Sequence, residues 1–147
     1  GRFEVAYTPG HASHHVSYRH QGTAFVGDVG GVRIIPSSMA IPPTPPPDID
    51  VEAWHESIAL IRSWRPERLA ITHFGSSDDV QAQLDEVDAR LDEWSQLARS
   101  GGRDEFIATV REQILADGSP ELAATYQQAA PVEQLYAGYE RYWSKRA

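Results

Sequence analysis

The sequence predicts a mixed α/β (α+β) fold, and three observations support this class. Short apolar runs separated by Pro, Gly and polar turns fill residues 3–35, a pattern typical of strands and hairpins. A helical pattern over 50–64 is followed by an apolar run over 68–72, which is the order of an α/β unit. Helical periodicity then continues from residue 76 towards the C-terminal end.

The N-terminal third is expected to form strands. Residues 3–7 alternate apolar and mixed positions and are broken by a Pro-Gly turn. Residues 15–19 and 23–26 are expected to pair as a hairpin around the turn at residues 20–22. Residues 32–35 predict a further short strand.

A proline-rich segment, residues 36–50, follows these strands. Such a segment is stiff and extended and has few backbone donors. We expect it to line a substrate pocket, with Met39 and Ile41 providing apolar contacts. An SH3-type ligand is the alternative use of this composition.

The remaining chain predicts helices. Asp50 caps a helix to about Trp64, and a strand covers residues 68–72. Ser76 or Ser77 is expected to cap the next helix, which Gly101-Gly102 ends. Its apolar positions form a seam for helix packing: Val80, Leu84, Val87, Leu91, Trp94 and Ala98.

Three shorter helices are predicted after that seam. The first covers about 104–116, the second starts at Ser119-Pro120 and the third at Pro131, because Ser and Pro are preferred at the N-cap and first helical positions. Aromatic residues crowd one side of the last helix and are expected to lie in the core: Tyr136, Tyr139, Tyr142 and Trp143, beside Leu135. A roof over the active site or a partner surface is the alternative role for this face.

Composition restricts the function classes. The chain of 147 residues is 41% hydrophobic and 23% charged, as in ordinary globular domains, and carries a net charge of −8. This charge argues against binding to nucleic acid or to an anionic membrane surface. Cysteine is absent, which excludes disulfides and thiolate ligands and fits a cytoplasmic protein. No apolar run approaches the length of a membrane span.

Three side chains at strand ends are candidate metal ligands: His11, Asp28 and His73. Strand ends that share one edge of a sheet bring their side chains near a common point. Two imidazoles and a carboxylate suit zinc, iron or manganese. A solvent-exposed turn His and a turn or N-cap Asp are the alternative interpretations of His11 and Asp28.

Other polar residues are assigned smaller roles. His15 is expected to donate a hydrogen bond to a ligand, and Thr72 to orient His73. Strand alternation places His14 on the opposite face from His15, at the surface. His20 and His55 are expected to be exposed to solvent. The Gly30-Gly31 pair would let the backbone pass close to a metal or substrate.

Over residues 3–75 the chain resembles the metallo-β-lactamase superfamily. The resemblance rests on Thr-Pro-Gly-His at 8–11, Gly-Asp at 27–28 after a hairpin, and the late strand-end His73. It implies that residues 1–75 form the C-terminal half of an αββα sandwich, followed by a helical region at 76–147. It also implies that His11 binds a first metal, His73 a second, and that Asp28 bridges two zinc ions.

The sequence departs from that family in one respect. The family's His-x-His-x-Asp-His run, which supplies the other ligands, does not occur here. We therefore expect the C-terminal part of a longer enzyme, shortened by truncation, proteolysis or a split gene. Metal binding by this chain alone should be weak or absent, and turnover absent. Copies are expected to associate as a homo-oligomer through the sheet or helices that the missing N-terminal half would cover.

The resemblance implies a metal-dependent hydrolase acting on a small molecule. Water activated between two metals would cleave an ester, thioester, lactone, amide or phosphoester. The alternative from another class is a non-enzymatic helical interaction or dimerisation module built on residues 50–147.

Overall fold

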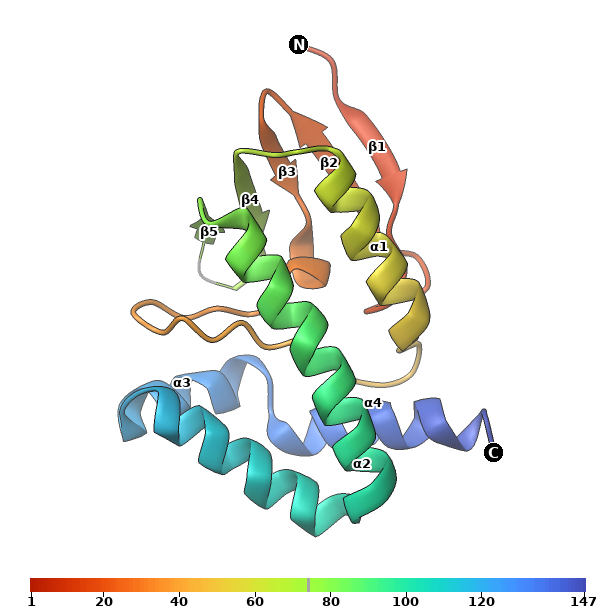
Figure 1. The fold of residues 1–147 in the computed structure, drawn as a ribbon, viewed down its shortest axis with the longest axis vertical. Coiled ribbons are helices and arrows are strands. Elements are labelled where there is room, and N and C mark those ends of the chain that lie inside the picture. Colours follow the sequence, from red (N-terminus) through yellow and green to blue (C-terminus); the bar gives the residue numbers. More distant parts are fainter. Residues whose placement is uncertain (74) are drawn as a thin grey trace.

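The computed structural model describes residues 1–73 and 75–147, in which strands and helices alternate before a helical C-terminal half (Figure 1). The elements in chain order are β1 (Glu4–Tyr7), β2 (Val16–His20), β3 (Thr23–Phe25), the 3₁₀ helix η1 (Gly27–Gly30), α1 (Val51–Ser63), β4 (Arg68–Ile71), β5 (Gly75–Ser77), α2 (Val80–Asp117), α3 (Pro120–Ala129) and α4 (Val132–Ser144). The mixed α/β class predicted from the sequence is confirmed.

In the described part of the chain the strands form one five-stranded sheet in the order β1-β2-β3-β4-β5. All neighbours are antiparallel except β3 and β4, which are parallel. The connection between β3 and β4 contains η1, the proline-rich segment and α1. The parallel pair therefore brings the residues that follow β3 and β4 to the same edge of the sheet.

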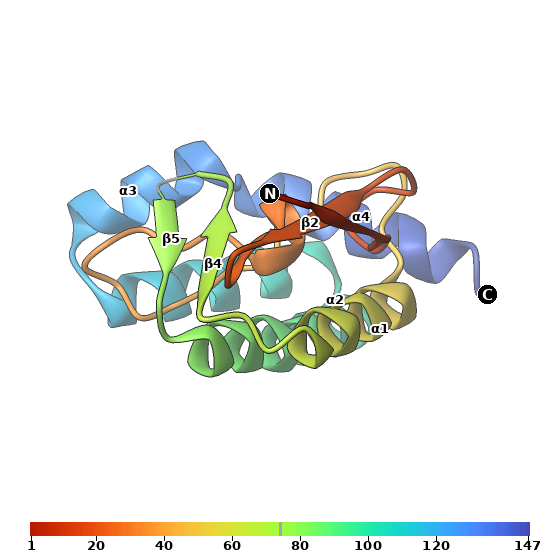
Figure 2. The same cartoon turned by 90° about the horizontal axis from the view of Figure 1, so that it is seen from above.

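Helices α1 and α2 lie together on one side of the sheet (Figure 2). Asp50 caps α1, accepting a hydrogen bond from the Ala53 amide at 3.0 Å. The apolar residues of α1 lie on one face and are buried, with Trp54, Ile58 and Ile61 fully covered. All residues of the seam predicted along α2 are buried as well.

The C-terminal helices begin and end close to the predicted positions, with one cap assigned wrongly. The predicted stop at Gly101-Gly102 is confirmed, because Gly102 has non-helical backbone angles and α2 consists of two helical stretches that meet at this kink. Ser119 caps α3 by accepting from the Leu122 amide. The predicted Ser76 or Ser77 cap is wrong, because both residues lie in β5 and the side chain of Asp79 caps α2 instead.

Two predictions for the segment before α1 are corrected. Residues 32–35 form no named strand; Val32 makes only an isolated antiparallel bridge to Ile41. Met39 and Ile41 do not line a pocket, because both are buried in the core. The segment folds back on itself, so these two side chains are covered by the protein rather than presented to a ligand.

Buried side chains from residues 24 to 142 form a single core cluster, which continues across the proposed boundary at residue 75. The other face of β1–β3 is not covered by the described elements. Five large apolar side chains are exposed there in cross-strand register, with Phe3 beside Phe25: Val5, Tyr7, Val16, Tyr18 and Phe25. No helix in the described residues is both long enough and apolar enough to cross a membrane.

Candidate metal centre

The turn at residues 8–11 is held by contacts on both sides. Thr8 is fully buried, and its hydroxyl lies 2.9 Å from Nδ1 of His15 and 2.7 Å from Oγ of Ser17. Gly10 adopts φ +139° and packs so closely on α1 that an added Cβ would lie 2.4 Å from Cβ of Trp54. The Pro9 and Gly10 carbonyls accept hydrogen bonds from Ser57 and Asp50. His11 therefore projects from a stiff corner.

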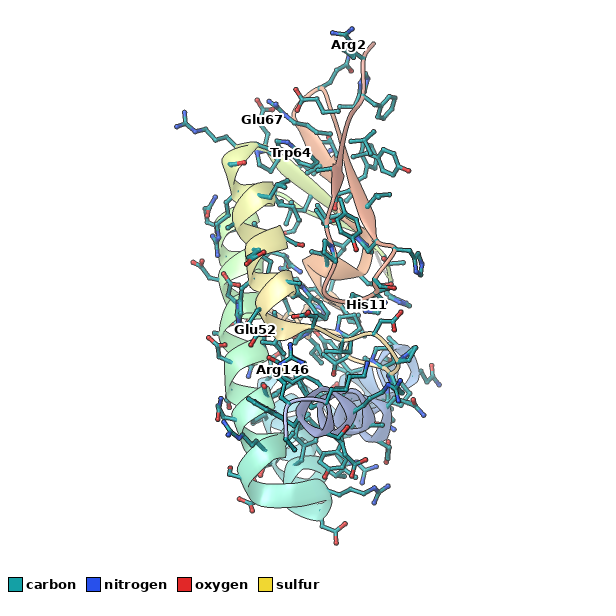
Figure 3. The ribbon with its side chains drawn as sticks, turned by 90° about the vertical axis from the view of Figure 1, so that its right-hand side faces the viewer. Arg2, His11, Glu52, Trp64, Glu67 and Arg146 are labelled. Atoms are coloured by element: carbon teal, nitrogen blue, oxygen red, sulfur yellow. The ribbon has the colours of Figure 1, made fainter. Side chains whose placement is uncertain are left out.

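The imidazole of His11 is oriented by the proline-rich segment. Its Nδ1 lies 2.7 Å from the carbonyl oxygen of Pro43. A carbonyl oxygen only accepts, so Nδ1 carries the proton and donates. Nε2 is then the atom left to face the rest of the site, and Figure 3 shows His11 at the end of the strands near the C-terminal helix. This orientation is the one that a ligating imidazole requires.

Asp28 lies in η1, directly after β3. Pairing with β4 continues past the strand, because the Val26 amide donates to the Ala70 carbonyl at 2.9 Å. The Asp28 carbonyl accepts from the Gly31 amide, which closes the turn. The side chain of Asp28 is thereby held at the edge where β4 also ends, and it is 24% exposed.

His73 follows β4 and has a left-handed backbone with φ +56°. This conformation is uncommon for a residue with a side chain, although His tolerates it better than most. Such outliers persist where the surrounding structure determines them, and they concentrate at functional sites. The turn directs the imidazole of His73 back towards Asp28.

The three predicted ligands come together in the structure. Nε2 of His11 lies 3.3 Å from Oδ2 of Asp28, and Nε2 of His73 lies 3.4 Å from Oδ1. Each imidazole therefore faces a different oxygen of one carboxylate. Oδ1 is buried and makes no hydrogen bond in the described structure.

These distances match the spacing of donors around a metal. In a tetrahedral site with ligand bonds of about 2.0–2.1 Å, neighbouring donor atoms lie about 3.3 Å apart. Each oxygen of Asp28 forms such a pair with one imidazole. Within the described residues, however, no three or more His, Asp or Glu side chains are grouped to hold one metal ion. These residues would supply two donors to each of two metal positions, which is only part of the three or four donors that zinc requires.

His15 and Thr72, the predicted supporting residues, lie beside the centre. The ring of His15 is 6.4 Å from that of His11, edge to face, and a Cβ on Gly27 would lie 2.9 Å from its Nε2 and 3.5 Å from the Thr72 hydroxyl. Burial lowers the pKa of His15, and the neighbouring His11 lowers it further, against the opposing effect of Asp28. Their support of the ligands stays a prediction.

Two of the three remaining histidines expected at the surface, His55 and His20, make contacts that were not predicted. His55 is not simply solvated, because its Nδ1 and Nε2 lie 2.7 Å from Asp88 and 2.8 Å from Asp92 on α2. The ring of His20 is not free in solvent, because it stacks on Phe3 with centroids 4.4 Å apart. His14 is exposed, as predicted.

Gly30 and Gly31 approach the core rather than a metal. A Cβ on Gly30 would lie 2.5 Å from the side chain of Val26, and one on Gly31 would lie 2.6 Å from that of Val87. The pair allows η1 to pack closely on the sheet and on α2.

Sequence reasoning missed the wall of the site. A cavity of about 310 Å³ contains the three candidate ligands and is bounded by Pro43 and Pro45, and by the corner between α3 and α4, residues 129–135. The proline-rich segment was expected there, although through other residues. The corner between α3 and α4, more than fifty positions after His73, was expected here only through the alternative that the last helix roofs the active site, and no motif marks the residues that form the wall.

Comparisons with known proteins identify the fold. No family model matches the chain. The chain is 34% identical over 74 residues to the metallo-β-lactamase fold-containing protein ST1585 of Sulfurisphaera tokodaii, a match that covers 50% of this chain and 27% of that protein.

Two solved structures share the fold. The archaeal metallo-β-lactamase superfamily protein ST1585 from Sulfolobus tokodaii superposes with a TM-score of 0.56 and 23% identity, over 94% of this chain and 45% of that one. The metallo-β-lactamase family protein TTHA1429 from Thermus thermophilus gives a TM-score of 0.59 with 17% identity, over 98% and 44%. The chain spans less than half of the length of each of these three matched proteins. It therefore has the metallo-β-lactamase fold, and its relative and its solved neighbours are proteins of the metallo-β-lactamase superfamily.

Proposed function

We propose that His11, Asp28 and His73 contribute part of a binuclear metal centre in a hydrolase, with zinc as the first candidate and iron or manganese as alternatives. The observation that supports this most strongly is the carboxylate of Asp28, whose two oxygens face two different imidazoles at 3.3 and 3.4 Å. A carboxylate placed in this way can bind one cation with each oxygen.

The hydrogen bond of His11 strengthens the proposal. Because Nδ1 donates to Pro43, the neutral ring presents the bare lone pair of Nε2 to Oδ2 of Asp28. Two acceptors that face each other at this distance repel unless a cation lies beside them. A metal ion supplies that charge, as would a second proton on the ring. The arrangement is therefore suited to a cation and poorly suited to an empty site.

The residues of this chain would hold and orient rather than perform proton transfer. A bound metal pair would supply Lewis acidity and lower the pKa of a bound water to about 7. His11 is kept in one tautomer by Pro43, and Asp28 is kept between the two imidazoles by η1 and β4. The substrate would be an ester, thioester, lactone, amide or phosphoester. With two donors for each position, we expect this chain alone to bind metal weakly and to turn over no substrate.

Paramagnetic broadening tests the metal site without relying on activity. Manganese(II) added to the ¹⁵N-labelled chain should first broaden amides around residues 11, 28 and 73. Asp28→Asn should weaken this effect by about tenfold or more, by analogy with the loss of a metal's supporting groups. His14→Ala is the matched control, since His14 is exposed near the same turn. Broadening centred instead on His55 and the acidic residues of α2 would refute the assignment.

Activity tests the remainder of the proposal. In a polypeptide that contains this chain together with the other ligands, His11→Ala and Asp28→Ala should each reduce hydrolysis to background while His14→Ala retains it. Full activity of the Asp28→Ala variant would exclude a bridging role for this carboxylate.

A further inference from the structure

We propose that the cavity beside Asp28 is an acyl site, which takes the uncharged, apolar acyl chain of a short carboxylic ester, thioester, lactone or amide and disfavours a phosphoester whose charge extends into it. This inference names the substrate class of the centre described above and therefore rests on the proposed function. It is carried by the walls of the cavity, by their rigidity and by the distribution of charge along them.

Two apolar segments form the walls. Pro43 and Pro45 form one side, and the corner between α3 and α4 forms the other through Ala130, Pro131 and Leu135. Proline has no backbone N–H, so these walls offer few donors to an anionic group. The volume of about 310 Å³ lies at the small end of the range for ligand sites, about 300–1,000 Å³, which indicates a short chain.

The two walls are locked together. The buried hydroxyl of Thr44 donates to the Leu135 carbonyl at 3.0 Å. Gly138, one turn further along α4, lies directly against the Thr44 carbonyl, where an added Cβ would come within 1.7 Å of the oxygen. Because Pro43 also fixes His11, the same segment sets the position of the ligand and of the wall. The cavity is therefore preformed.

Charge in the cavity selects against anions. No Lys or Arg occurs among the described residues that line it, so beyond the candidate ligands the wall offers no cationic side chain to an anionic group. The net charge of −8 adds to this bias. Away from the candidate ligands, Gln134 on the exposed rim is the polar side chain among these lining residues. Its carboxamide can donate to an acyl carbonyl or accept from an amide N–H.

A metal-free titration tests the acyl site directly. The ¹⁵N-labelled chain, in chelator at about pH 8 to keep ordinary histidines neutral, is titrated with butanamide, pentanamide and hexanamide, and separately with hexyl phosphate. The amides should shift backbone resonances of residues 129–135 in a saturable manner, with affinity rising about two- to fourfold per methylene. Hexyl phosphate should shift these resonances several-fold less at the same concentration.

Two variants separate charge from shape. Gln134→Lys places a cation on the rim and should raise the affinity for hexyl phosphate to that for hexanamide or above it. Gln128→Lys, on the exposed side of α3, adds the same charge away from the cavity and should leave the preference for hexanamide unchanged. Equal or stronger binding of hexyl phosphate by the unsubstituted chain would overturn the proposal. So would an absence of amide-induced shifts at residues 129–135. Because the titration contains no metal, a negative result contradicts the acyl site and not the metal centre. A negative manganese experiment contradicts the metal centre and not the binding of amides to the cavity.

Discussion

Replacement of Gly10 by alanine tests how the turn that presents His11 is held. Gly10 has φ +139°, a backbone conformation that L-residues rarely adopt, which costs about 1–3 kcal/mol. The new Cβ would also lie 2.4 Å from Cβ and 2.5 Å from Cα of Trp54. Trp54 cannot move freely, because it is fully buried and its indole N–H donates to the Val29 carbonyl at 3.0 Å. Overpacking of this kind adds about 1–3 kcal/mol.

We therefore expect Gly10→Ala to lower the free energy of unfolding by about 3 kcal/mol or more, a large share of the roughly 5–15 kcal/mol of an ordinary domain. Urea unfolding followed by tryptophan fluorescence measures it, with a fall in midpoint of about 1–2 M. Gly75→Ala is the matched control, since Gly75 has φ +118° but nothing within 4 Å of its added Cβ. If both variants lose the same stability within about 0.5 kcal/mol, backbone strain alone explains the effect, and the argument from packing against Trp54 is wrong.

Three further outcomes are expected. The pKa of His55 is raised above 6.5, chiefly by its hydrogen bond to Asp88 and further by the one to Asp92. The stability that the protonated ring contributes is therefore fully present below pH 6.5 and is lost as the pH rises through the folded-state pKa. In urea unfolding, His55→Asn should cost about 1 kcal/mol more at pH 5.5 than at pH 8.5. We propose that the apolar face of β1–β3 drives association of copies at high micromolar concentration. Tyr18→Glu should therefore shift sedimentation towards the monomer. Leu115→Glu, at a similarly exposed position on α2, should leave sedimentation unchanged. Gly138→Ala should displace the Thr44 carbonyl and with it the preceding Pro43, whose carbonyl accepts from His11, so the ¹⁵N shifts of the His11 ring should change. An unaltered His11 spectrum in a folded variant would show that α4 does not position this ligand.

Much of the candidate centre follows from local sequence signals because each ligand stands directly after a short strand or a turn. Pro and Gly mark the corner before His11, and the Gly-Asp pair follows β3 without an intervening loop. Once β3 and β4 are adjacent and parallel, their ends must share an edge, so the approach of Asp28 to His73 depends only on that pairing. The order of the helices and most of their caps could be predicted for the same local reason.

Features that depend on long-range contacts could not be predicted in this way. His55 lies off the apolar stripe of α1, and only the packing of α2 places Asp88 and Asp92 on either side of its ring. Met39 and Ile41 resemble pocket residues by position, but the isolated bridge between Val32 and Ile41 turns the segment inwards. The partners of His55 are distant in sequence, and in neither case does the deciding partner carry a motif.

The wall of the cavity shows why fold similarity alone leaves the substrate open. The ligand turn and the wall meet in the segment at residues 43–45, where one carbonyl orients His11 and the next residue's hydroxyl anchors α4. A change in the C-terminal helices would therefore alter the shape of the cavity and the orientation of a ligand together. It follows that substitutions on α4 should affect the metal site as well as substrate choice.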